Sequence, residues 1–102
     1  MQRLWKVIAE IEVQPGDFNL EPGYTKGFMN VITWASSAHS VQEKLSQYLK
    51  SFDWQLLLVD DVAVVDESGG YEEEIAEMIE RARQNPKAII LGCFHAYQQR
   101  LQ

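Results

Sequence analysis

Apolar residues recur at every second position in the first part of the chain and at every third or fourth position further on. Alternation and continuous apolar runs predict four strands: 4–13, 27–35, 54–66 and 88–96. The three-four spacing predicts two helices, 38–51 and 71–84, and the apolar stripe of the first includes Tyr48 and Phe52. The element order is therefore β-β-α-β-α-β.

This order predicts a single α+β domain over residues 1–102, built as a two-layer sandwich. One mainly antiparallel sheet should carry both helices on one face, because each strand–helix–strand connection is expected to cross over right-handedly. The plan is similar to a ferredoxin-like domain with its elements shifted, a likeness of architecture that names no function. Strands 27–35 and 54–66 are apolar on both sides. We therefore expect a homodimer through the helix-free sheet face.

Two consecutive acids, Asp60 and Asp61, interrupt the apolar run of the third strand. They indicate a bend or bulge within one long strand, or else a tight turn between two short strands. On a regular strand their side chains point to opposite faces, so they cannot act as paired catalytic carboxylates.

The segment between the first two strands, QPGDFNLEPGYTKG at 14–27, is too long for a tight hairpin. Pro22-Gly23 suits a type II turn, so part of 17–26 is predicted to form a projecting β-arm that continues the strands. Phe18 and Tyr24 lie within this segment. Apolar side chains there either tuck over the edge of the core or form a contact surface.

Acidic residues outnumber basic ones by 15 to 9, and the net charge of −6 argues against nucleic acid as the main partner. Nine of the acids lie between Asp60 and Glu80, a stretch without lysine or arginine. Such asymmetry suits the capture of a basic protein partner, the alternative being a merely solvated face. We expect the partner-binding residues to be Asp60, Asp61, Asp66, Glu67, Glu72 and Glu73, together with Phe18 and Tyr24.

No arrangement of residues indicates catalysis, a metal or a cofactor, and we expect none of the three. Cys93 and His95 share a face of the last strand, but positions two apart on a strand stand about 7 Å apart, beyond hydrogen-bond reach. No paired-ligand motif indicates zinc, and His39 falls on the polar side of its helix. The chain also has no phosphate-binding glycine motif.

The single cysteine, Cys93, excludes an internal disulfide and favours a reducing compartment, so we expect a cytoplasmic protein. No apolar run approaches the ~18 residues that a membrane span needs, so no membrane partner is expected.

These features favour a small, soluble, acidic binding module over an enzyme, and one that docks a basic protein. Bacterial immunity and antitoxin proteins are similar in type, sharing size, acidity and the lack of a catalytic motif, although no sequence motif carries the likeness. One alternative is a small-molecule-binding domain or small enzyme, with a pocket between the sheet and the 14–27 loop and His95, Tyr97 or Asp60 as polar groups. The other is a self-associating structural domain.

Overall fold

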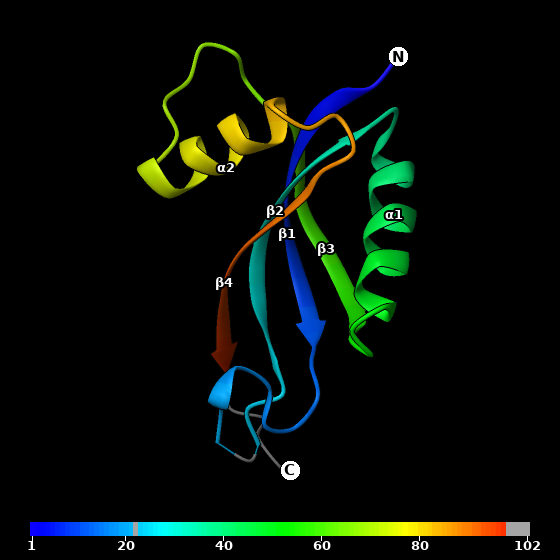
Figure 1. Ribbon diagram of the computed structural model, residues 1–102, viewed down its shortest axis with the longest axis vertical. Coiled ribbons are helices and arrows are strands. Elements are labelled where there is room, and N and C mark those ends of the chain that lie inside the picture. The colour runs from blue at the N-terminus through cyan, green and yellow to red at the C-terminus, as the bar shows by residue number, and fades with distance from the viewer. Residues whose placement is uncertain (22, 98–102) are drawn as a thin grey trace.

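The computed structural model describes residues 1–21 and 23–97 (Figure 1). The four strands are β1 (Arg3–Glu12), β2 (Lys26–Ala35), β3 (Gln55–Val64) and β4 (Ile89–Tyr97). The helices are α1 (Ala38–Lys50) and α2 (Glu73–Arg83), and a short 3-10 turn, η1, spans Asp17–Asn19. The predicted order of strands and helices is confirmed, with each boundary within two residues of the expected one. None of the described helices has the length and apolarity needed to cross a bilayer.

The four strands form one sheet in the order β3-β1-β2-β4, and every pairing is antiparallel, as predicted. The hairpin of β1 and β2 makes the centre of the sheet and pairs without interruption from Arg3–Ala35 to Glu12–Lys26. The chain then places β3 at one edge and β4 at the other. The two edge strands are therefore neighbours along the chain but not in the sheet.

The helices cover opposite faces of the sheet, and the expectation that both lie on one face was wrong. Val31 packs in the core under α1, whereas the next residue, Ile32, packs in the core under α2. Because neighbouring strand residues point to opposite faces, the domain has three layers rather than two. In Figure 1, α1 runs beside β3 and α2 lies across the upper end of the sheet on the other side.

The error has an identifiable cause. The right-handed crossover rule governs connections between parallel strands. Helix α1 does join a parallel pair, β2 and β3, but α2 joins β3 to β4, which run antiparallel at opposite edges. The two-layer, ferredoxin-like plan therefore has no support here. Within the described residues a helix packs on each face, so neither face is free of helices as the expected homodimer surface required. A homodimer as such stays a prediction.

Each helix packs against the sheet over a separate hydrophobic core. Helix α1 begins at the N-cap Ser37, whose hydroxyl accepts the backbone N–H of Ser40, and it buries Val41, Leu45 and Leu49. Helix α2 buries four residues against the upper end of the other face: Ile75, Met78, Ile79 and Ala82. Two half-buried indoles donate hydrogen bonds to backbone carbonyls, one within the sheet and one between β2 and α2. Trp5 donates to Ala35 at 2.9 Å and Trp34 donates to Ala82 at 2.7 Å.

The acids in the middle of β3 form a bulge, which confirms the first of the two sequence-based alternatives. Between Lys6 and Ile8 of β1 the pairing partner moves from Ala63 to Asp60, so β3 holds one extra residue there. Asp61 accordingly has a left-handed φ of 48°. The strand continues past this point, which excludes a turn between two short strands. A second shift in register near Leu57 makes β3 an irregular edge.

Candidate functional site

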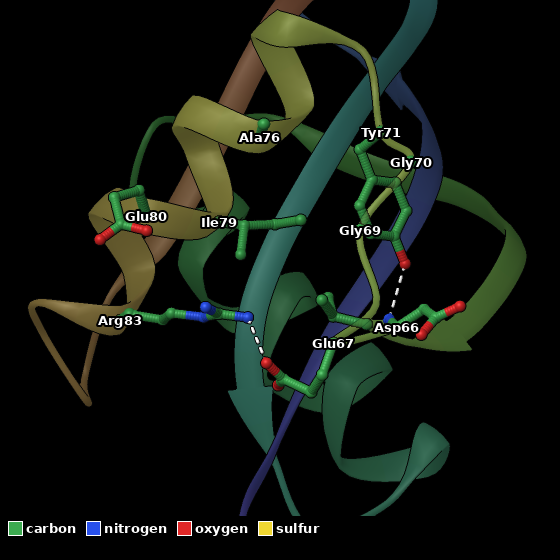
Figure 2. A pocket seen from close by; sticks show the side chains of 10 residues that line it. Asp66, Glu67, Gly69, Gly70, Tyr71, Ala76, Ile79, Glu80 and Arg83 are labelled. Carbon is green, nitrogen blue, oxygen red and sulfur yellow. Dashed lines mark hydrogen bonds and ion pairs between the residues drawn. The ribbon is translucent and has the colours of Figure 1, made fainter.

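Two of the predicted partner-binding acids line a cavity of about 210 Å³ between α2 and the loop that follows β3 (Figure 2). Glu67 forms an ion pair of 2.5 Å with Arg83, the last residue of α2. The carboxylate of Asp66 accepts the backbone N–H and the hydroxyl of Ser68, and these two bonds hold the pKa of Asp66 below its usual range. The backbone N–H of Asp66 donates to the Tyr71 hydroxyl at 2.7 Å. Both carboxylates therefore have local partners that shape the loop.

The other predicted acids are Asp60, Asp61, Glu72 and Glu73. The first two lie on β3. The second two begin α2 above the opposite edge of the sheet, since the adjacent Glu74 carboxylate accepts the N–H of Cys93 on β4 at 3.4 Å. At the usual strand spacing, about 14 Å separates the two edge strands. The structure therefore does not gather the six acids on one surface.

Asp60 and Asp61 instead lie among exposed apolar side chains of the edge strand β3. Four large apolar side chains of β3 are exposed to solvent: Leu57, Leu58, Val62 and Val64. Together with Asp60 and Asp61 they form what we call the β3 strip. No strand pairs with its outer side within the described residues, and β3 contains no lysine or arginine. Bulges and charges prevent edge strands from pairing with a further strand. We therefore expect a partner to bind the side chains of the β3 strip rather than to add a strand to its backbone.

Five aromatic rings from distant parts of the chain contact one another near η1, the end of α1 and the start of β3. These segments lie at the lower end of the ribbon in Figure 1. This base cluster consists of Phe18, Tyr48, Phe52, Trp54 and Phe94. Phe18 stacks on Phe94 with ring centroids 5.1 Å apart and touches Trp54 at 5.4 Å. Phe52 joins Trp54 at 4.9 Å and Tyr48 at 5.2 Å. Three of the rings remain exposed: Phe18 by 51%, Phe52 by 43% and Tyr48 by 36%.

Hydrogen bonds fix the base cluster from the loop side. The Asp17 carboxylate accepts the Trp54 indole N–H at 2.8 Å and the backbone N–H of Gln14 at 2.9 Å. The Gln14 side chain in turn donates to the backbone carbonyl of Asp53 at 2.6 Å. Phe18 has a left-handed φ of 57°, a conformation that costs roughly 1 kcal/mol for a residue with a side chain. The contacts of the loop therefore hold Phe18 in a left-handed backbone conformation that is unfavourable for phenylalanine.

The loop is not the projecting β-arm that we expected. One backbone bond, from Val13 N–H to the Thr25 carbonyl at 2.7 Å, extends the hairpin, and the chain then turns back through η1. The predicted turn at 22–23 includes Pro22, which lies outside the described residues. Tyr24 is half-buried and donates its backbone N–H to the Glu21 carbonyl. By turning back, the loop packs Phe18 against Trp54 and Phe94.

A close approach of two strands lets Phe94 enter the base cluster. Gly27 on β2 lies under the Phe94 ring, and a Cβ atom at this position would stand 2.8 Å from its Cζ. The same atom would stand 2.5 Å from the His95 carbonyl oxygen. Only glycine leaves room for this packing.

The sequence also singled out three polar residues of β4: Cys93, His95 and Tyr97. Cys93 and His95 are both exposed, and the charge of Glu74 raises the pKa of the Cys93 thiol, which opposes a nucleophilic role. The Tyr97 hydroxyl donates to Glu10 across the sheet, and this bond raises the pKa of Tyr97 to about 12. Within the described part of the chain, no three His, Cys, Asp or Glu side chains are grouped to hold a metal ion.

Comparison with protein-family models, with curated protein sequences and with solved structures finds no match for this chain. The candidate surfaces therefore rest on geometry. Of the predicted residues, Phe18 lies in the base cluster, and Asp60 and Asp61 lie in the β3 strip. Sequence reasoning missed Tyr48 and Phe52, which we had assigned to the buried stripe of α1. One signal was available for Phe52, because it lies beyond the end of the helix.

Proposed function

We propose that this protein is a non-catalytic interaction module that docks a basic protein partner through the β3 strip. One observation carries the proposal. A single edge strand combines four exposed apolar side chains with the carboxylates of Asp60 and Asp61, and it contains no base. The likeness in type to immunity and antitoxin proteins and the cytoplasmic location belong to this proposal.

The mixture of groups indicates the chemistry of the partner. Exposed apolar side chains supply affinity when a partner buries them, and adjacent carboxylates favour a partner that presents lysine or arginine. The net charge of −6 adds long-range attraction for the same kind of partner. Self-association through this strip is less favourable, because two antiparallel copies would bring their aspartates together near the middle of the strand.

The test uses a synthetic ten-residue peptide of alternating lysine and valine, with a glutamate–valine peptide as its charge-reversed control. Calorimetry measures binding to the wild-type protein and to the double variant Asp60→Asn, Asp61→Asn. We expect this variant to bind the lysine peptide about fivefold more weakly, since two exposed charge pairs contribute about 1 kcal/mol together. Wild-type affinity should fall as salt rises.

The matched control is Glu72→Gln, Glu73→Gln, which removes the same charge at the opposite edge of the sheet. We expect this control to change the affinity by less than about twofold, because screening weakens charges more than a Debye length away. An equal loss in both double variants would show that only net charge matters and would refute the β3 strip as the docking surface. Sedimentation across micromolar concentrations tests one of the two alternatives, the self-associating homodimer.

A further inference from the structure

The base cluster adjoins the β3 strip, and the proposed function leaves it unused. Trp54 immediately precedes β3, and its ring contacts both Phe18 and Phe52. Three rings of the cluster remain more than a third exposed although they pack against their neighbours, and exposed apolar patches mark interaction sites. Exposed aromatic side chains held in place by their neighbours are typical anchor residues of protein interfaces.

The charges around the cluster favour a cation. Asp17 places its carboxylate at the edge of the Trp54 indole, and Asp53 directly precedes that residue. Glu21 follows in the same loop, and Lys50 lies in the last turn of α1. Aromatic faces carry negative potential, so rings flanked by carboxylates attract a positive group over the ring plane.

We propose that the base cluster anchors an arginine side chain of the basic partner, stacked on the exposed aromatic rings around Phe18. The inference rests on the proposed function, because it names the group by which the same partner is held. Arginine is favoured over lysine because its planar guanidinium stacks on a ring while its N–H groups bond nearby carboxylates. The Asp17 and Gln14 bonds position the rings before the partner arrives, which lowers the entropy lost on binding.

Three alternating ten-residue peptides test the proposal: arginine–valine, lysine–valine and citrulline–valine. Citrulline keeps the planar shape of arginine without its charge. We expect the arginine peptide to bind about threefold to fivefold more tightly than the lysine peptide, and the citrulline peptide to bind most weakly.

The three tryptophans provide the site-specific readout. Each indole N–H bonds a different acceptor: Trp5 to Ala35, Trp34 to Ala82 and Trp54 to Asp17. In a nitrogen–proton correlation spectrum, we expect the arginine peptide to shift the Trp54 indole signal. The Trp5 and Trp34 side chains pack against the cores under the helices, so the chemical shifts of their indole signals should not change.

Substitution of Phe18 distinguishes specific binding of arginine at the base cluster from non-specific binding of the peptides. We expect Phe18→Ala to remove the preference for arginine over lysine. The matched control is Phe28→Ala, which removes a ring of similar exposure (42%) on the sheet, outside the cluster, and should leave the preference intact. Phe18→Leu keeps the apolar packing but lacks a π face, so it should behave as Phe18→Ala does. Unshifted Trp5 and Trp34 signals verify that each variant is folded.

The outcomes distinguish the inference from the proposed function. Equal binding of the arginine and lysine peptides, with the Trp54 signal unmoved, overturns the arginine anchor while an effect at Asp60 and Asp61 still supports the β3 strip. An arginine preference that depends on Phe18 but ignores those aspartates supports the anchor and refutes the strip. Failure of every cationic peptide to bind overturns both. A dimer that Phe18→Ala dissociates makes the cluster a self-association surface and also overturns the anchor.

Discussion

The base cluster and the loop of Figure 2 are held together over very different distances along the chain. In the loop, Asp66 bonds Ser68, two positions away. In the cluster, the bond from Trp54 to Asp17 spans 37 positions, and the Phe18 ring reaches a strand at the other end of the sequence. The density of acids along the chain predicted a docking surface there, yet Asp66 bonds Ser68 and Glu67 bonds Arg83, 16 positions away. Long-range packing assembled the more exposed aromatic surface from residues that are unremarkable by themselves.

The largest expected difference in stability between the two regions comes from removing Trp54, the ring at the centre of the base cluster. We expect Trp54→Ala to lower the free energy of unfolding by about 2–4 kcal/mol, because a half-buried ring that joins α1, β3 and the loop leaves a cavity. In the upper loop, Tyr71→Phe deletes only the acceptor of one backbone N–H and should cost about 1 kcal/mol. Urea unfolding followed by circular dichroism measures both. Equal losses would mean that the two regions are equally integral to the fold.

A second pair of variants compares one acid from each region. Asp17→Ala should cost about 1–2 kcal/mol, since the carboxylate accepts two N–H groups that would lose their partner. Glu67→Ala should cost less than about 0.5 kcal/mol, because its ion pair with Arg83 lies at the surface. Denaturation midpoints at matched ionic strength provide the measurement. A larger loss for Glu67 would reverse the comparison.

Variants that change backbone strain should alter the stability by a smaller amount. Asn19 has a left-handed φ of 57°, and we expect Asn19→Gly to stabilise the protein by about 0.5 kcal/mol because glycine adopts this conformation without strain. Gly69 in the upper loop has a φ of 86°, so Gly69→Ala should destabilise by about 1 kcal/mol. Thermal unfolding of the two variants checks the opposite signs. Destabilisation by Asn19→Gly would show that the Asn19 side chain has a role of its own.

The smallest expected effect is the acid titration of the upper loop. The Ser68 bonds lower the pKa of Asp66 in the folded state, so the carboxylate contributes stability above its ordinary pKa of 3.8. That contribution is lost as the pH falls through the lower, folded-state pKa. Comparison of wild type with Asp66→Asn between pH 5 and about pH 2 should show the difference in stability shrinking. A difference that stays constant over this range would contradict the assignment.

The periodicity of apolar residues by itself determined the four strands, the two helices and the long loop, because helix and strand periods reflect geometry within a few neighbouring residues. The interruption at Asp60-Asp61 was also visible in the sequence, but the sequence left a bulge and a turn between two short strands as alternatives. The register of β3 against β1, with one extra residue between the partners of Lys6 and Ile8, decided for the bulge.

Only the tertiary structure decided which sheet face each helix covers and which strands form the edges. The rule that governs helix placement applies to parallel strands, and β3 and β4 become antiparallel only through the pairing of both with the central hairpin. The candidate sites depend on the same long-range pairing. It leaves β3 uncovered on its outer side, and it brings Phe94 of β4 over Gly27, within reach of Phe18. Such contacts depend on how distant segments pair, a property that the local spacing of residues does not contain.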